Sequence, residues 1–187
     1  MIRSAPLHAL AVAAVLLAAA PAAAKVFLSM DEALRTAFPG CQVERRTAYL
    51  TPAQLAKARE LAGVEVPSAL VNYHTATRNG QPAGTAYFDT HRVRTLPETL
   101  MIVVDPQGKV ARIEVISFRE PEEYMPRGAW YQQFLGRTLD RELQLKQAIR
   151  PVTGATLTAR ATTAAVRRVL ALHQVINAAV GAGGAAP

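Results

Sequence analysis

The stretch Leu100-Met-Ile-Val-Val-Asp-Pro-Gln-Gly-Lys-Val-Ala-Arg-Ile-Glu-Val-Ile-Ser-Phe118 has two apolar segments separated by a turn signal. Asp105-Pro-Gln-Gly108 supplies the turn, because Asp, Pro and Gly each suit a particular backbone position of a tight turn. The segments on either side, 100–104 and 109–118, are rich in the β-branched residues that favour strands. We therefore predict a β-hairpin here.

A second hairpin is predicted upstream of the first. Residues 70–77 lead into an Asn79-Gly80 turn signal, and residues 84–90 return from it. The two strands of a hairpin run in opposite directions, so consecutive hairpins predict an antiparallel sheet.

Two helices are predicted before the hairpins, with one strand between them. Ser29-Met-Asp-Glu32 has the spacing of a capping box, and Pro39-Gly40 ends the helix that it starts. Thr51-Pro-Ala-Gln54 repeats the device with a Pro at the first helical position, and Gly63 ends that helix. Residues 42–50 alternate in polarity as a strand does.

The chain after the hairpins is predicted to be mainly helical. We expect a short helix or turn over 130–134 and a helix over 139–148. From Leu157 to about Ala178, apolar residues recur at helical spacing, which predicts the longest helix of the chain. The Gly/Ala-rich residues 181–187 are expected to form a flexible tail. The fold class predicted is α+β, an antiparallel sheet with packed helices.

The segment Thr153-Gly-Ala-Thr-Leu-Thr158 lies at the start of that long helix. Backbone N–H groups and the positive end of the helix dipole favour an anion at such a place, so we expect a phosphate there. Gly154 and Ala155 keep the loop bare, and Thr156 presents a hydroxyl that can bind a phosphate or be esterified by it. The simpler interpretation is an ordinary helix cap.

Length and composition indicate one compact domain. The chain has 187 residues, of which 50% are hydrophobic, and we assign residues 25–180 to that domain. Its net charge of +7 is spread over short basic pairs without interleaved aromatic residues, so we expect no nucleic-acid partner. Cys41 is the only cysteine, which excludes an internal disulfide and a cysteine-based metal site within one chain, and no metal site is expected.

The first 24 residues have the pattern of a secretory signal peptide. Arg3 precedes an uncharged Leu/Ala/Val segment, and small residues at Ala22 and Ala24 fit cleavage before Lys25. The apolar segment is shorter than the roughly 20 residues of a spanning helix, although an uncleaved anchor is the alternative. We therefore expect export to the periplasm, with possible association with the inner membrane.

The string Val-Thr-Gly-Ala-Thr-Leu-Thr-Ala over 152–159 resembles the signature of the FMN-binding domain family. That family includes subunits of the Rnf and sodium-pumping NADH:quinone reductase complexes and many small exported proteins. The similarity extends upstream to Phe118-Arg-Glu-Pro-Glu-Glu-Tyr124 and Trp130-Tyr-Gln-Gln-Phe-Leu-Gly136, and covers roughly 100–172. The resemblance implies FMN bound by the loop before the last long helix.

In this family the threonine that matches Thr156 carries FMN through a phosphoester, attached outside the cytoplasm by a flavin transferase. The transferase pattern commonly has an aspartate three residues before the first Ser/Thr, and this chain has Arg150 there. Attachment by a transferase that accepts Arg150 and non-covalent FMN in the same loop both fit the sequence.

The resemblance also implies which residues surround the cofactor. The hairpin end lies near the isoalloxazine in the family, which makes Glu120, Pro121 and Tyr124 candidate neighbours of the ring, and Trp130 a further one. Surface acids and a core aromatic are the alternative interpretation. His91, next to two arginines after a strand, is a candidate contact of the flavin phosphate, the ribityl chain or a partner. The expected cofactor-binding residues are Thr153, Gly154, Ala155, Thr156, Leu157, Thr158, Glu120, Tyr124 and His91.

An exported electron carrier is the function that these features predict. A single small domain has no evident second site for nicotinamide or an organic substrate, so we expect a membrane quinone or a cytochrome as redox partner and assign no catalytic residue. Two alternatives remain open at this point. One is a flavin-dependent reductase of a small acceptor, and the other is a flavin-free binding or assembly module.

Overall fold

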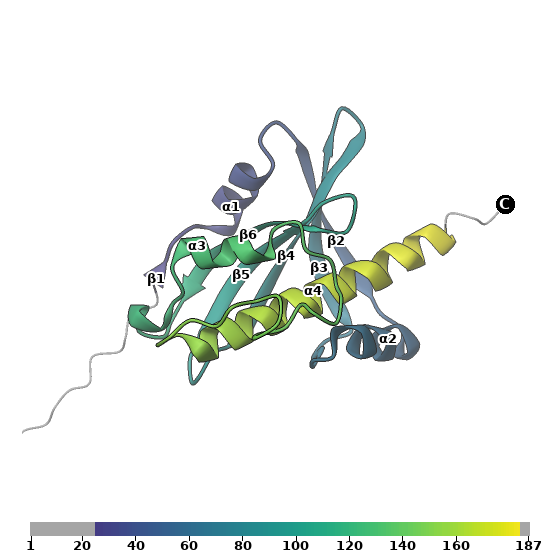
Figure 1. Ribbon diagram of the computed structural model, residues 1–187. Coiled ribbons are helices and arrows are strands. Elements are labelled where there is room, and N and C mark those ends of the chain that lie inside the picture. Colours follow the sequence, from purple (N-terminus) through teal and green to yellow (C-terminus); the bar gives the residue numbers. More distant parts are fainter. Residues whose placement is uncertain (1–24, 184–187) are drawn as a thin grey trace, which may run out of the picture.

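The computed structural model describes residues 25–183. They form an α+β fold with a six-stranded antiparallel sheet in the order β1-β6-β5-β4-β3-β2 (Figure 1), which confirms the predicted fold class. The strands are β1 (Lys25–Val26), β2 (Gln42–Tyr49), β3 (Leu70–Arg78), β4 (Gln81–Arg92), β5 (Pro97–Val104) and β6 (Val110–Phe118). The predicted signal peptide, 1–24, lies outside the described residues, and none of the helices within 25–183 is both long and apolar enough to cross a bilayer.

Both predicted hairpins are confirmed. Asn79 and Gly80 join β3 to β4 with φ angles of 51° and 76°, the left-handed backbone that a tight hairpin turn requires. Asp105 fixes the turn between β5 and β6, because its Oδ1 accepts hydrogen bonds from the backbone N–H groups of Gln107 and Lys109 at 2.9 and 2.8 Å. The short strand β1, which pairs with the end of β6, is an addition to the predicted sheet.

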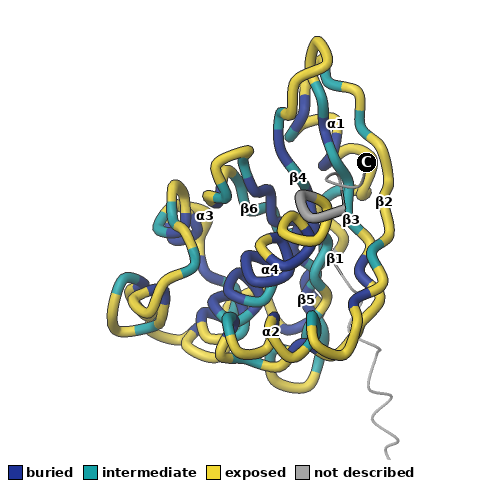
Figure 2. Tube along the Cα trace, turned by 90° about the vertical axis from the view of Figure 1, so that its right-hand side faces the viewer, coloured by how far each residue is buried: buried dark blue, intermediate teal, exposed yellow. Residues whose placement is uncertain are grey.

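The sheet is buried on both faces around its central strand β5. Leu100, Ile102 and Val104 belong to one apolar cluster, and Met101 and Val103 belong to the other. This follows from the alternation of side chains along a strand. The burial of the central strands and of most of the last helix is visible in Figure 2.

Four helices cover the two faces. The helix α1 (Met30–Ala37) packs on the cluster of Met101 and Val103, while α2 (Pro52–Ala62), α3 (Gly128–Tyr131) and α4 (Thr156–Gly183) cover the other face. The capping boxes predicted for α1 and α2 are both present. The helix α4 crosses this face of the sheet beside α2 (Figure 1), so the start of α4 is held by the main core.

The prediction of a helix over 139–148 is wrong. These residues form an irregular segment in which Leu143 is fully buried and Lys146 has a φ angle of 67°, outside the helical range. Hydrogen bonds between the side chains of Asp140 and Arg167 and the backbone explain why this segment is not helical. Asp140 Oδ1 accepts from the N–H groups of Glu142 and Leu143, and the guanidinium of Arg167 donates to the carbonyls of Asp140 and Leu143. These contacts satisfy backbone groups that a helix would otherwise pair.

The long C-terminal helix extends further than predicted. It runs through Gly183 and so includes the first residues of the segment 181–187 that the sequence indicated as a tail, while 184–187 lie outside the described residues.

Candidate functional site

The signature residues form a tight turn followed directly by α4. Gly154 has a φ angle of 82°, and the N–H of Ala155 donates to the carbonyl of Val152 at 3.2 Å, which closes the turn. The first hydrogen bond into the helix comes from the N–H of Ala159 to the carbonyl of Ala155. The N–H groups of Thr156 and the next two residues therefore have no partner within the helix and are available to an anion.

The three threonines of the segment differ in their surroundings. Thr156 is exposed, and its Oγ1 donates to the carbonyl of Val152 at 3.1 Å. Thr153 is also exposed. Thr158 is buried, and its Oγ1 donates to the carbonyl of Tyr124 at 2.5 Å. The hydroxyls of Thr153 and Thr156 are accessible to a reagent from solvent, whereas that of Thr158 ties the start of α4 to the segment after β6.

Two pockets flank Thr156. The smaller, of about 210 Å³, is lined by residues 154–158 together with Arg94 and Tyr124, and here the guanidinium of Arg94 lies 4.8 Å from the centroid of the Tyr124 ring. The larger, of about 440 Å³, lies between the end of α2, the irregular segment and α4. Its lining residues are Gly63, Val64, Gln144, Leu145, Lys146, Pro151, Thr156, Arg160, Thr163, Ala164 and Arg167. None of the described residues that line these two pockets is acidic.

Glu120 has a structural role that the sequence did not predict. Its Oε1 accepts hydrogen bonds from the backbone N–H groups of Arg94, Thr95 and Leu96 at 3.2, 2.7 and 2.8 Å. Burial acts to raise the pKa of Glu120, but these hydrogen bonds outweigh it and hold the pKa below its usual value. Glu120 lines neither pocket next to Thr156; it fixes the loop that presents Arg94.

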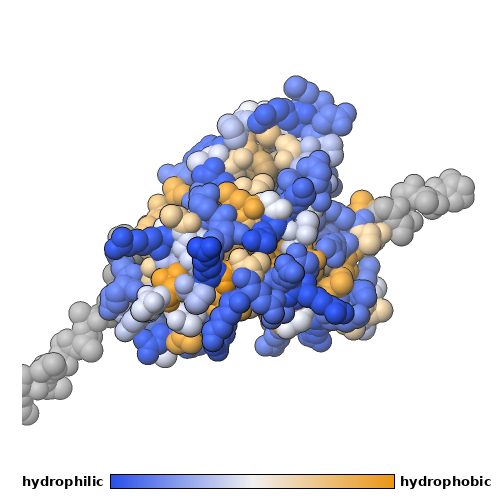
Figure 3. Space-filling model, viewed as in Figure 1, coloured by the Kyte–Doolittle hydropathy of each residue, from blue (hydrophilic) through white to orange (hydrophobic). Residues whose placement is uncertain are grey.

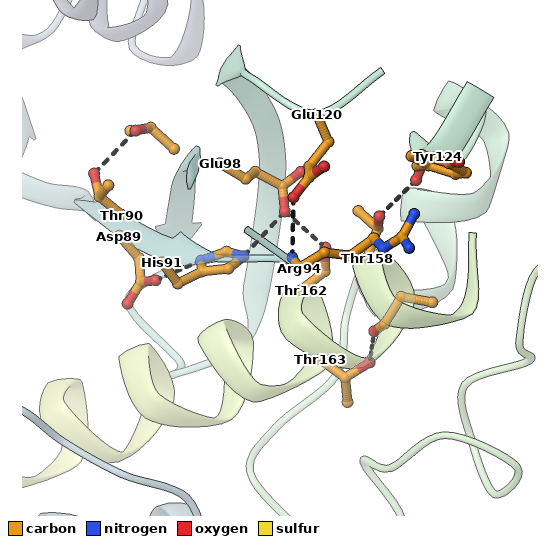
Figure 4. A network of polar contacts seen from close by, with 12 residues as sticks. Asp89, Thr90, His91, Arg94, Glu98, Glu120, Tyr124, Thr158, Thr162 and Thr163 are labelled. Carbon is orange, nitrogen blue, oxygen red and sulfur yellow. Dashed lines mark hydrogen bonds and ion pairs between the residues drawn. The ribbon is translucent and has the colours of Figure 1, made fainter. Parts of the chain in front are cut away.

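His91 lies in a buried polar network away from the signature turn (Figure 4). Its Nδ1 is 2.9 Å from Asp89 Oδ1 and its Nε2 is 3.0 Å from Glu98 Oε2. Burial would lower the pKa of His91, but the two carboxylates outweigh it and raise the pKa to about 9. The ring is therefore protonated at neutral pH with both nitrogens engaged, and it lines neither pocket next to Thr156.

The network continues into α4 and α3. Glu98 is fully buried and pairs directly across the sheet with His91, and Thr162 Oγ1 lies 3.4 Å from its Oε2. The buried hydroxyl of Tyr131 has no hydrogen-bond partner among the described residues, and burial together with the nearby Glu98 carboxylate raises its pKa. Asp89 is held by Arg168 of α4.

Trp130 is a buried core residue that anchors the approach to the signature turn. Its Nε1 donates to the carbonyl of Arg150 at 2.7 Å, and its ring packs edge-on against Tyr131 and Phe134. The N–H of Arg150 donates to Gln133 Oε1 at 2.8 Å. The backbone of Arg150 is thus fixed, while the residue is exposed.

Several residues at the site were not predicted from the sequence. Arg160 lies one helical turn after Thr156, so both residues share one face of α4. This spacing could have indicated from the sequence that Arg160 lies at the site. Lys146 had no such signal, because its segment was predicted to be helical. Arg94 reaches the turn through the loop between β4 and β5, a contact that only the tertiary structure brings about.

Part of the chain matches a known protein family. Residues 96–171 match the model of the FMN-binding domain, and this match supports FMN as the cofactor. The match extends from β5 to α4 and includes the signature turn. Comparisons with curated proteins and with solved structures gave no match.

The geometry around Thr156 fits FMN. The glycine at 154 leaves open space, since a Cβ built there has nothing within 4 Å. Free N–H groups and nearby cationic side chains suit the phosphate, and the larger pocket has the volume usual for small-molecule sites, roughly 300–1,000 Å³. No cluster of His, Cys, Asp and Glu suited to a metal ion occurs among the described residues.

Proposed function

We propose that this protein is an exported flavoprotein that carries FMN as a phosphoester on Thr156 and serves as an electron carrier. The observation that carries the proposal is the exposed Thr156 hydroxyl in the first turn of α4, inside the matched FMN-binding domain. A phosphate on this oxygen lies beside N–H groups that the helix does not use, where the helix dipole favours negative charge.

The choice of Thr156 over its neighbours rests on burial and on spacing. Both hydroxyls donate to a carbonyl, that of Thr156 to Val152 and that of Thr158 to Tyr124. Thr158 is buried, so a phosphate on its oxygen would have to displace the packing around it, whereas Thr156 is exposed. Thr153 is exposed but lies within the turn, three residues before the helix begins. Non-covalent FMN held by the same turn is the outcome that the experiment below separates from esterification.

The bound FMN supplies the redox chemistry, and the residues of this chain position it. The turn at Gly154 holds the phosphate end, and Arg94 and Arg160 place positive charge on either side of Thr156. Because both flanking pockets open at the surface next to an exposed residue, an electron can pass to a partner without a substrate entering the core. This arrangement supports a carrier that exchanges electrons with a membrane quinone or a cytochrome.

Location and maturation are part of the proposal. The signal-like sequence of 1–24 leads us to place the mature protein in the periplasm, at or near the inner membrane. A flavin transferase is the maturation partner, and the exposed position of Thr156 leaves room for such an enzyme to act on the folded domain.

The experiment compares Thr156→Val with Thr153→Val after production together with a flavin transferase. Valine keeps the branched shape of threonine and replaces the hydroxyl by a methyl group. We expect flavin fluorescence in the denatured wild-type and Thr153→Val bands, and none in the Thr156→Val band. Intact mass then shows one FMN less one water on the wild type, and it also reports whether 1–24 has been removed. Equal fluorescence in both variants would contradict attachment at Thr156.

The carrier role is tested separately. Protein reduced with dithionite is mixed with a soluble quinone analogue or a c-type cytochrome, and the return of the oxidised flavin spectrum is followed by stopped flow. Rapid oxidation by one of them, without turnover of small organic acceptors in a steady-state screen, is the expected result. Turnover of a small acceptor with NADH as donor would instead favour a reductase.

A further inference from the structure

The exposed cations around the signature turn carry an inference that rests on the proposed carrier function. They are Arg94, Lys146, Arg150 and Arg160, and we call them the basic rim. We infer that the basic rim is the docking surface for a redox partner protein whose own docking face is acidic. The inference names the chemistry of the partner's surface, which attachment of FMN at Thr156 does not determine.

The basic rim is assembled by the tertiary structure from three separate parts of the chain. Arg94 comes from the loop between β4 and β5 and lines the smaller of the two pockets beside the attachment site. Lys146, from the irregular segment, and Arg160, from α4, line the larger pocket. Arg150 directly precedes Pro151, which lines that same pocket. Basic residues that are scattered along the sequence therefore surround one place on the surface.

Acidic side chains do not compensate the charge of the basic rim. None of its four members takes part in the ion pairs found among residues 25–183. The chain contains no acidic residue after Glu142. Glu123 and Glu142 are exposed acids of the neighbouring segments, but neither lines a pocket next to Thr156. The rim thus presents its positive charge to solvent.

Bound FMN would neutralise only part of this charge. A phosphodiester on Thr156 carries a single negative charge, and the free N–H groups of the first helical turn already stabilise it. Four positive charges in the rim against one negative charge leave a net charge of +3. That excess attracts an anionic surface and raises the rate at which a partner with such a surface meets the site.

The apolar content of the surface favours a protein over a membrane as the anionic partner. A helix that binds a bilayer surface presents a stripe of apolar side chains. At the start of α4 the exposed residues are Thr156, Leu157 and Arg160, and only the leucine, which is 45% exposed, is apolar. Figure 3 shows that hydrophilic side chains cover most of this face and that apolar surface appears in small separate areas. A small apolar centre within a charged rim is typical of protein–protein interfaces.

Two forms of one haem protein test the charge of the partner. Native cytochrome c is basic, whereas succinylated cytochrome c carries carboxylates on its lysines. The flavin-loaded protein is reduced with a stoichiometric amount of dithionite and mixed with each form, and haem reduction is followed by stopped flow. Each reduced flavin gives one electron to each of two haem irons and its N5 proton to water. We expect added salt to slow the reaction with the succinylated form and to speed the reaction with the native form, because salt screens the charges.

Charge reversal at single positions tests the place of docking. Arg150→Glu and Lys146→Glu each reverse one charge of the basic rim, and Arg45→Glu is the matched control. Arg45 is exposed on β2, on the same side of the strand as Val43, which packs against the α1 cluster on the opposite face of the sheet. At low salt we expect each rim variant to lower the rate constant for the succinylated form about tenfold, and the control to change it less than about twofold. Equal effects of all three variants would overturn the inference, since net charge alone would then govern the reaction.

A binding measurement without flavin separates this inference from the proposed function. Thr156→Val retains the basic rim, and we expect calorimetry to show salt-sensitive binding of succinylated cytochrome c that Arg150→Glu weakens in the same background. Binding that ignores Arg150→Glu would contradict the docking surface. Wild-type protein without FMN, as judged by intact mass, contradicts the proposed function instead.

Vesicles test the membrane as the alternative partner. Sedimentation with phosphatidylglycerol vesicles, and with phosphatidylcholine vesicles as the neutral reference, is expected to respond equally to Arg150→Glu and Arg45→Glu, because attraction to a flat anionic surface follows the net charge. A loss of phosphatidylglycerol binding that is confined to Arg150→Glu would assign the basic rim to the membrane surface and overturn the inference.

Discussion

Arg168 holds Asp89 through two hydrogen bonds of equal length, from Nε to Oδ2 and from Nη2 to Oδ1, each 2.8 Å. The arginine belongs to α4 and the aspartate to β4, so this forked ion pair joins the last helix to the sheet. Burial acts to raise the pKa of Asp89, but Arg168 and His91 outweigh it and hold the pKa below its usual value. The pair is thus a fixed electrostatic link between the helix that carries the signature turn and the centre of the fold.

Removal of the arginine is expected to destabilise the fold strongly. Arg168→Gln leaves the buried Asp89 without its main partner, and breaking one side of such a pair usually costs about 3–5 kcal/mol. Urea unfolding measures the change in the free energy of unfolding. Arg141→Gln is the control, since Arg141 is exposed, and the expected change there is within about 0.5 kcal/mol. A similarly small change for Arg168→Gln would contradict the role of the pair.

Stability is expected to fall at alkaline pH because of His91. The pKa of His91 is raised from its usual 6.5 to about 9, so the protonated ring stabilises the folded state. This contribution is complete below about pH 6.5 and is lost as the pH rises through about 9, with a total of roughly 3 kcal/mol. Urea unfolding between these pH values measures it. His91→Gln should remove this part of the pH dependence, and an equal slope in both proteins would refute the assignment.

Glu120 is expected to contribute to stability and to the position of Arg94. Glu120→Gln removes the charge that three backbone N–H groups share, and hydrogen bonds to a charged group contribute about 1.5–3 kcal/mol. We expect a loss of about 2 kcal/mol in the free energy of unfolding. Glu123→Gln, an exposed acid of the same segment, is expected to be nearly neutral. If the two variants behave alike, the carboxylate does not organise the loop.

The backbone of the signature turn requires glycine at 154. Gly154 and Gly128 both have open space where a Cβ would lie, but only Gly154 has a positive φ, of 82°. Gly154→Ala is expected to cost about 1–2 kcal/mol through backbone strain alone and to reduce the flavin content after co-production with a transferase. Gly128→Ala is the matched control and should leave both unchanged. Thermal unfolding and absorbance of the attached flavin provide the two measurements.

Local signals predicted most of the fold. The hairpin turns at Asn79-Gly80 and Asp105–Gly108, and the capping boxes at Ser29 and Thr51, are each specified by neighbouring residues, so the sequence predicted them within a few positions. The segment 139–148 was mispredicted because its backbone partners include Arg167, which is far away in the sequence. Helix propensity is a property of neighbouring residues and does not reveal hydrogen bonds to residues far away in the sequence.

The sequence predicted the contiguous part of the site and missed the residues that only tertiary contacts bring to it. Thr156 and Gly154 stand in a contiguous signature, which the family match contains. Lys146, Arg94 and Glu98 reach their places through tertiary contacts. Glu98 in particular is a fully buried acid in a strand, and only its pairing across the sheet with His91 explains it.

The position of Thr156 as the first residue of α4 has a consequence for the order of assembly. Its N–H is not part of the helical hydrogen-bond ladder, and its side chain lies at the surface, so a group can be added to its oxygen without opening a single helical turn. The polypeptide can therefore fold to completion before the cofactor arrives. Amide hydrogen exchange along α4 should be slow already in the chain without flavin, and loading should slow only the first few amides.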